Sequence, residues 1–253
     1  MKTAIITVAG ISSRFNKGIP EREKKLKAVF FEENKEDTLL FHLLQSCSFA
    51  DRIIVVGGYQ YEALCDYCNM LANHLKDKVT LVYNEHFEDL ASGYSLYLGL
   101  KEAFKDDVDE ILFVEGDLDI DRVSFEKAVN SPLSVLTYNY EPIYASKAVV
   151  LYKDENGRFR YAFNSDHGML KIDGPFSCIL NSGQLWKFTE VDNLKKANEG
   201  FYKEEKDGTN LRIIQRYLDL GTETELIGLK RWTNCNTRED YHRIVSYWEG
   251  DNK

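Results

Sequence analysis

Residues 4–15 read AIITVAGISSRF, and this stretch is the strongest indicator of the fold. The apolar and β-branched run from Ala4 to Val8 predicts a buried strand. The small residues after it allow a backbone turn to approach a ligand closely, and the N–H groups of such a turn can hold phosphate oxygens. Arg14 adds a planar cation that suits phosphate. We therefore expect a phosphate-binding turn directly after the first strand.

The rest of the first half alternates between strand and helix patterns. Strand patterns occur at 52–56, 79–83 and 110–114, and helical patterns at 39–48, 60–75 and 92–104. This alternation predicts crossover connections and an α/β fold with a mostly parallel central sheet flanked by helices. Ligands of such sheets bind at the carboxyl ends of the strands. The loops after Val8, Tyr83 and Val114 should therefore share one rim.

The second half has a different pattern. Strands are expected at 134–138, 148–152, 158–163 and 225–228, and helices at 184–205, 209–218 and 237–248. Asp154 to Gly157 is a good hairpin turn between two of these strands. No linker divides the chain, so we expect one domain over residues 1–253 that carries an inserted segment.

Composition excludes several classes of protein. The chain has 253 residues, of which 43% are hydrophobic, and this suffices for one substantial core. No apolar run reaches the length of about 18 residues that a membrane span needs, and the start is too short for a signal peptide, so we expect a cytoplasmic protein. The five cysteines are odd in number and scattered, which argues against a disulfide framework.

Charge is distributed unevenly. The net charge of −9 argues against a broad nucleic-acid surface. The segment from Arg14 to Lys27 is nevertheless basic, which indicates either a site for a polyanion such as a triphosphate or an ordinary solvated charge run.

The first turn and the basic segment together resemble the signature loop of nucleotidyltransferases with the Rossmann-like GT-A fold. That loop runs Ala-Gly-x-Gly-x-Arg and ends in a lysine. Ser12 stands at the second glycine of the pattern. Lys25 and Lys27 both fit the lysine, and Lys27 is preferred because residues 28–30 continue the pattern. The resemblance implies catalytic roles for Arg14 and Lys27, with Lys25 as the other candidate. The nucleotide contacts that it implies in this region are Ala9, Gly10, Ile11, Ser12, Ser13 and Gly58.

A magnesium site is expected after the fourth strand, where residues 114–121 read VEGDLDID. A carboxylate at that position can hold Mg²⁺ by one or two oxygens. The resemblance assigns the metal to Asp117 and a nucleotide contact to Gly116, while Asp119 and Asp121 would assist through water. Asp121 alternatively caps the next helix. Asn236 stands where many members have a second metal-binding Asp, and its amide oxygen is the weaker ligand.

The remaining motifs suggest which substrates bind. Residues 84–98 resemble the base and ribose segment of phosphocholine-type cytidylyltransferases, which implies nucleotide contacts from Ser92 and Ser95, although a helix cap explains both equally well. Residues 174–186 resemble the acceptor region of the family. The acceptor contacts that we expect are Tyr138, Asn181, Ser182 and Trp186, with Asp166 and His167 as further candidates. Core packing is the alternative for each aromatic residue.

The resemblance implies Mg²⁺-dependent transfer of CMP from CTP to a small phosphorylated metabolite. Residues 1–131 would then bind the nucleotide, and residues 132–253 would supply the acceptor site and the last helix. The whole chain is similar to cytidylyltransferases that act on phosphoglutamine for capsule phosphoramidate, which makes phosphoglutamine the favoured acceptor and phosphocholine the next. The alternatives are a sugar-1-phosphate nucleotidyltransferase, a GT-A glycosyltransferase and a non-catalytic nucleotide sensor. Nothing in the sequence indicates an oligomer.

Overall fold

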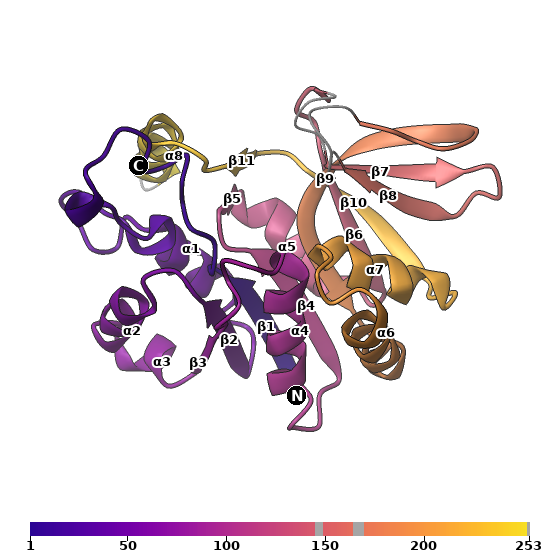
Figure 1. Cartoon of the computed structure of the whole chain (residues 1–253), viewed down its shortest axis with the longest axis horizontal. Helices are drawn as coiled ribbons and strands as arrows, with labels where there is room; N and C mark the ends of the chain where they lie inside the picture. The colour runs from indigo at the N-terminus through magenta and orange to yellow at the C-terminus, as the bar shows by residue number, and fades with distance from the viewer. Residues whose placement is uncertain (145–148, 164–169, 252–253) are drawn as a thin grey trace.

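The central sheet of the computed structural model begins with parallel strands (Figure 1). They are β1 (Lys2–Thr7), β2 (Arg52–Gly57), β3 (Val79–Tyr83) and β4 (Glu110–Glu115). Strand β1 lies between β2 and β4, with Ile6 opposite Val55 and Val114. The structure describes residues 1–144, 149–163 and 170–251. All four strands fall within a residue or two of the stretches expected from their apolar and β-branched runs.

Antiparallel strands extend this sheet with residues from the second half of the chain. They are β6 (Ser134–Asn139), β7 (Val149–Asp154), β8 (Phe159–Phe163) and β9 (Phe176–Phe188), and β10 (Thr224–Leu229) adds a parallel edge beside β6. Strand β9 lies between β4 and β6, and its first part also pairs with β7. The order along the sheet is β10-β6-β9-β4-β1-β2-β3. The expected α/β class with its mostly parallel central sheet is confirmed.

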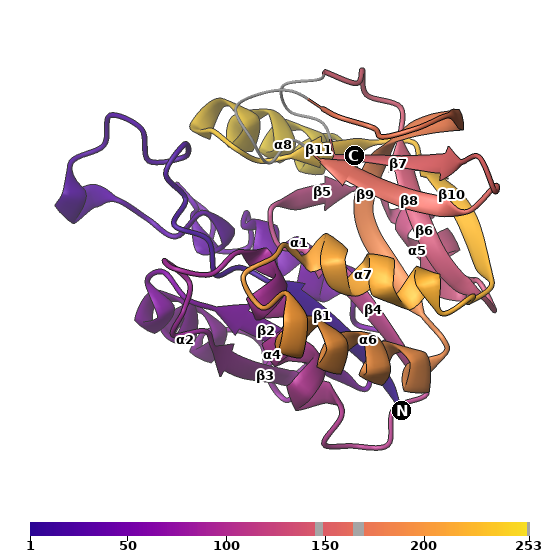
Figure 2. The same ribbon diagram turned by 45° about the vertical axis from the view of Figure 1, so that its right-hand side comes forward.

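Helices cover both faces of the sheet and create two separate apolar layers. One layer contains α1 (Leu39–Ser46), α2 (Tyr61–Asn69) and α5 (Arg122–Asn130). The other contains α4 (Ser92–Ala103), α6 (Val191–Glu204) and α7 (Asn210–Asp219), of which α6 and α7 lie side by side in Figure 2. Strand β1 contributes side chains to both layers, since Ile6 packs into the first and Ile5 into the second. Strands that are buried on both faces are mostly apolar, as the fully buried Ala4, Ile5 and Ile6 of β1 are.

The C-terminal segment returns to the first half of the chain. Helix α8 (Arg238–Asp251) packs on Phe15 and Leu39 in a third apolar cluster. The short strand β11 (Trp232–Asn234) pairs with β5 (Leu118–Ile120). The short helices are η1 (Glu21–Glu23), η2 (Lys27–Val29) and α3 (Asn73–Lys76). Within residues 1–144, 149–163 and 170–251, no helix has both the length and the apolar character of a membrane span.

Two helix predictions were wrong. The helix expected at 184–205 begins only at Val191, because the preceding residues continue β9 and bury Leu185 and Trp186 in the sheet. The helix expected at 60–75 is interrupted after Asn69, but Leu71 and Leu75 pack into the same apolar layer as α2, and this common face explains the continuous apolar pattern. The expected acceptor candidates Asp166 and His167 lie outside the described residues.

Asp119 was expected to assist a metal through water, and the structure contradicts this. Its carboxylate is buried and accepts hydrogen bonds from Arg231 Nη1 at 2.6 Å and Trp248 Nε1 at 2.8 Å. Asp119 therefore anchors helix α8. Asp121 caps α5, because its carboxylate accepts from Ser124 N at 2.9 Å.

The buried ammonium of Lys187 ties helix α5 to the sheet. Its Nζ donates to Val129 O and Ser131 O, both at 2.7 Å, and lies 2.9 Å from Glu110 Oε2. We expect Lys187→Met to lower the free energy of unfolding by about 3 kcal/mol, because it leaves a carboxylate and two carbonyls without their cation. Urea denaturation measures the change. Lys203→Met is the control, since that side chain is exposed and its loss should cost less than about 0.5 kcal/mol.

His42 should make stability fall in acid. Its ring stacks on Trp248 with centroids 3.6 Å apart, and burial, with a smaller contribution from Arg231, lowers its pKa from 6.5 to about 4. Between these values the unfolded chain binds a proton that the folded chain does not, so stability is lost as the pH falls below 6.5. We expect His42→Phe to abolish a loss of up to about 2 kcal/mol between pH 7.5 and 5. Equal pH dependence of the urea midpoints of wild type and variant would contradict this prediction.

Candidate active site

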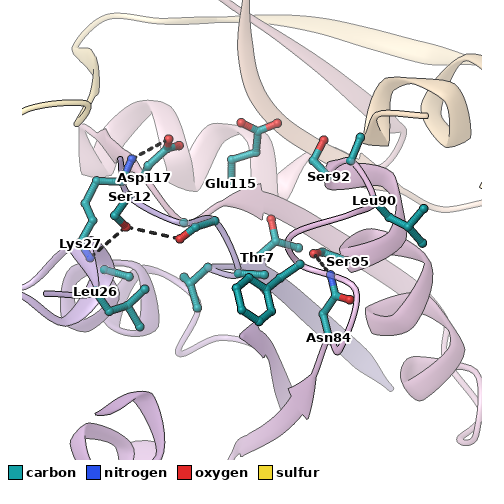
Figure 3. Close-up of a pocket in the computed structure, with 17 residues that line it drawn as sticks. Thr7, Ser12, Leu26, Lys27, Asn84, Leu90, Ser92, Ser95, Glu115 and Asp117 are labelled. Carbon is teal, nitrogen blue, oxygen red and sulfur yellow. Dashed lines mark hydrogen bonds and ion pairs between the residues drawn. The ribbon is translucent and has the colours of Figure 1, made fainter. Parts of the chain in front are cut away.

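A cavity opens at the carboxyl ends of β1 and β4 (Figure 3). Its walls come from the turn after β1, residues 26–28, the start of α4 with the loop before it, and residues 115–117. The predicted site residues that line it are Ala9, Gly10, Ser12, Lys27, Ser92, Ser95, Gly116 and Asp117. The cavity therefore lies at the rim of the sheet that the strand pattern predicted.

The turn after β1 is held by side chains as well as by its backbone. Ser12 adopts a left-handed conformation with φ of 58°, which is uncommon for a residue other than glycine. Its Oγ accepts a hydrogen bond from Lys27 N at 3.3 Å. The buried Asn16, which sequence reasoning missed, donates to Ser12 O at 3.2 Å and exchanges hydrogen bonds with the backbone of Lys25. These contacts fix the end of the basic segment against the turn.

Lys27 faces Asp117 across the cavity. Its Nζ lies 3.0 Å from Asp117 Oδ2, and both side chains are largely buried. Lys25 is exposed and does not line the cavity. The same holds for Arg14, Ile11 and Ser13. Of the two candidate lysines, Lys27 lines the cavity and Lys25 does not.

Asp117 and Asn236 offer oxygen atoms that fit a hard cation. Asp117 Oδ1 and Asn236 Oδ1 are buried, and neither has a hydrogen-bond partner among the described residues. The two residues belong to adjacent segments, since Cys235 N donates to Asp117 O at 2.8 Å. Within the described parts of the chain, three or more His, Cys, Asp or Glu residues nowhere gather to hold a metal. Asp117 lines the cavity and Asn236 does not. Asp117 Oδ1 is therefore the oxygen that suits Mg²⁺, which takes one or two protein oxygens and completes its shell with water and substrate phosphates.

Glu115 is a cavity residue that sequence reasoning missed. Gln184 Nε2 donates to its Oε2 at 2.7 Å, and Asn210 Nδ2 donates to its Oε1 at 2.6 Å. Burial, together with the neighbouring charge of Asp117, raises the pKa of Glu115 to about 8. Its position as the last residue of a buried strand, two residues before the expected metal ligand, was the signal available in the sequence.

The far wall of the cavity is small and partly apolar. Phe87 and Leu90 line it, together with Ser92, Ser95 and the buried Asn84. Asn84 Nδ2 donates to Ser95 Oγ at 2.9 Å, and Ser92 Oγ donates to Asn210 Oδ1 at 3.3 Å. Gly58 does not line the cavity but lies behind Phe87.

The four expected acceptor residues lie outside the cavity lining. Trp186 is fully buried, stacks on Phe113 with centroids 5.1 Å apart and donates to Tyr161 OH at 2.7 Å. This burial contradicts an acceptor contact for Trp186. Ser182 is also buried, and its Oγ accepts from Gln184 N at 3.3 Å.

Asn181 and Tyr138 likewise interact within the second half of the chain. Asn181 Nδ2 donates to Asn139 Oδ1 at 3.0 Å, and the hydroxyl of Tyr138 lies 3.3 Å from that of Tyr140.

Comparison with known proteins gives a family and a shared fold. A family model described as "Domain of unknown function (DUF6564)" matches residues 23–248. The chain belongs to the DUF6564 family. The matched range includes Lys27, Glu115 and Asp117 and begins after the turn that follows β1. No curated protein matches this DUF6564 chain by sequence.

Solved structures of nucleotidyltransferases share the fold of this DUF6564 protein at low sequence identity. The inositol-1-phosphate CTP transferase from T. maritima has a TM-score of 0.66 at 16% identity, over 97% of this chain and 95% of that chain. The CTP:phosphocholine cytidylyltransferase from Streptococcus pneumoniae has a TM-score of 0.65 at 17% identity, over 98% and 99%. A UDP-glucose pyrophosphorylase complexed with UDP-glucose has a TM-score of 0.66 at 13% identity, over 99% of both chains. The expected GT-A nucleotidyltransferase fold is confirmed by these likenesses.

Gly58 should be required for the shape of the cavity wall. A Cβ at this position would lie 2.5 Å from Phe87 Cβ and 3.0 Å from Ala9 Cβ. We expect Gly58→Ala to cost about 1–3 kcal/mol of stability, because two packed segments must move apart. Gly10→Ala is the control, since a Cβ there would meet no atom within 4 Å. Equal urea midpoints for the two variants would contradict this account of the wall.

Proposed function

We propose that this DUF6564 protein is a Mg²⁺-dependent nucleotidyltransferase that transfers CMP from CTP to a small phosphorylated acceptor and releases pyrophosphate. The observation that carries the proposal is the pair formed by Lys27 and Asp117, 3.0 Å apart beside the turn after β1. Asp117 also keeps one buried oxygen without a hydrogen-bond donor among the described residues. The fold shared with solved nucleotidyltransferases supports the same reading.

In the proposed reaction an oxygen of the acceptor phosphate attacks the α-phosphorus of CTP. The bond from the α-phosphorus to the bridging oxygen breaks, and pyrophosphate leaves with the electron pair. Such a transfer needs positioning and charge stabilisation more than covalent help from the protein. The turn at residues 9–12 would orient the phosphates with its backbone N–H groups.

Lys27 and Asp117 would change partners when the substrate binds. Asp117 and Asn236 would hold Mg²⁺, which when bound neutralises phosphate charge and aligns the reacting oxygens. Lys27 would then be released from Asp117 and would place its ammonium against the charge that develops on pyrophosphate. The ion pair in the free protein keeps each side chain near its working position.

The acceptor that we favour is phosphoglutamine, with phosphocholine next, in a cytoplasmic pathway that modifies capsule or surface polysaccharide. This choice rests on the resemblance of the whole sequence to cytidylyltransferases of that kind. A sugar 1-phosphate is the second candidate, because the UDP-glucose pyrophosphorylase structure shares the fold over its whole length.

Pyrophosphate release with Mg²⁺ tests the proposal directly. The panel contains the four nucleoside triphosphates, each with phosphoglutamine, phosphocholine, phosphoethanolamine and several sugar 1-phosphates. We expect release with CTP and an acceptor, and loss of release in Asp117→Ala. Tight Mg²⁺-dependent nucleotide binding without release would instead support a non-catalytic nucleotide sensor.

The two lysines of the basic segment provide a matched pair of variants. We expect Lys27→Met to lower kcat about a hundredfold, because the developing charge loses its preorganised cation. Lys25→Met should leave kcat within about twofold of wild type, since its side chain is exposed and away from the cavity. Similar losses in both variants, or a loss only in Lys25→Met, would contradict the assignment to Lys27.

A further inference from the structure

We infer that Glu115 selects the acceptor by binding a positively charged nitrogen, so that the substrates are phosphates that also carry an ammonium group and not neutral sugar or polyol phosphates. This inference rests on the proposed function and adds a specificity determinant to it.

Glu115 occupies the boundary between the two halves of the site. It lines the cavity between Asp117 and Ser92, and its carboxylate points away from the turn after β1 (Figure 3). Both of its hydrogen-bond donors come from the second half of the chain, Gln184 from β9 and Asn210 from α7. Glu115 therefore lies where an acceptor would meet the nucleotide.

A strained bulge in β9 holds the side chain that orients Glu115. Gln184 has a φ of 54°, a left-handed value that is uncommon outside glycine, at the register shift where β9 passes β6. At Gly183, a Cβ would lie 2.5 Å from Thr137 Oγ1 and 2.7 Å from Leu229 Cδ1. Bulges beside functional sites redirect a side chain, and here the redirected amide of Gln184 donates to Glu115.

The donors that fix Glu115 do not neutralise it. Both are neutral amides, and no Lys, Arg or His forms an ion pair with Glu115 in the described parts of the chain. The nearest cation of the site, Lys27, pairs with Asp117. A carboxylate that only neutral amides hold needs a cation beside it to stay charged next to a triphosphate and a phosphate, and a positively charged nitrogen of the acceptor would supply one.

A metal role for Glu115 fits the contacts less well than a role in acceptor binding. Each oxygen of Glu115 already accepts a hydrogen bond, whereas Asp117 Oδ1 accepts none from the described residues. A positively charged nitrogen, with or without N–H groups, is attracted by the charge of an oriented carboxylate and does not require a vacant lone pair. Phosphoglutamine and phosphocholine both carry such a nitrogen, and sugar 1-phosphates do not.

The test compares two acceptors that differ only in charge. Phosphocholine and 3,3-dimethylbutyl phosphate have the same shape, with carbon in place of the charged nitrogen in the second. We expect wild type to favour phosphocholine by about tenfold or more in kcat/KM. Glu115→Gln should lower kcat/KM for phosphocholine by about tenfold, chiefly through KM, and leave the neutral acceptor and the KM for CTP within about twofold.

Two controls separate charge recognition from folding. Asp107→Asn removes one charge from an exposed residue at the opposite end of β4 and should change neither acceptor. Choline, which lacks the phosphate, should inhibit wild type competitively against the acceptor and should inhibit Glu115→Gln at least about tenfold more weakly.

The outcomes distinguish this inference from the proposed function. Pyrophosphate release that favours sugar 1-phosphates, or equal losses for the charged and neutral acceptors in Glu115→Gln, would overturn the inference and leave nucleotidyl transfer standing. Absence of release with every nucleotide and acceptor would overturn the proposed function itself.

Discussion

Strands β1 and β4 approach so closely at their carboxyl ends that Gly116 has no room for a side chain. A Cβ there would lie 2.3 Å from Val8 Cγ1 and 2.7 Å from Thr7 O, and Gly116 N donates to that same oxygen at 3.0 Å. Because the strands are parallel and in register, this contact brings the turn after β1 and the carboxylates after β4 to one rim. The 3.0 Å pair of Lys27 and Asp117 depends on it, since Asp117 directly follows Gly116 and Lys27 N donates to Ser12 Oγ in the turn after β1. A looser approach of the two strands would separate the turn after β1 from Asp117.

Strand β9 then connects this rim to the second half of the chain. It is inserted between β4 and β6, so the strands of the second half of the chain share one sheet with those of the first half. The hydroxyl of Thr137 fills the register shift by donating to Leu185 O at 2.6 Å and accepting from Leu185 N at 3.2 Å. The residues on either side of this shift have different roles. Trp186 packs into the core, whereas Gln184 reaches the cavity and binds Glu115. The inserted strand thus supplies both the core of the second half and its link to the site.

The sequence predicted the elements whose signal is local. Runs such as Ala4 to Val8 are mostly apolar because both faces of the sheet are covered, and they located the parallel strands β1, β2, β3 and β4. The turn after β1 and the acidic residues after β4 followed from residue types directly after those strands, and the resemblance to the nucleotidyltransferase loop singled out Lys27 and Asp117. The missed features depend on contacts far along the chain. The residues of β9 pass through a bulge and lead into a helix, so the pattern near Trp186 suggested a helix. The acceptor contact expected of Trp186 came from the resemblance to the family's acceptor region. The side chains that define Glu115 come from positions 69 and 95 residues away, and no local pattern records them.

Glu115 and Asp117 show why proximity in sequence is a poor guide to role. They are two residues apart and line the same cavity, yet their surroundings differ. Asp117 faces the cation of Lys27 and keeps an oxygen without a donor among the described residues, which would suit a metal ligand. Glu115 faces two amides from the second half and has no cation among its described partners. The ion-pair partner of Asp117 therefore comes from the first half of the chain, and the hydrogen-bond donors to Glu115 come from β9 and α7. Under the proposed function, changes at Gln184 and Asn210 could alter the acceptor while the phosphate-binding turn, Lys27 and Asp117 stayed the same. Such a division allows one fold to keep its transfer reaction and vary the molecule that receives the nucleotide.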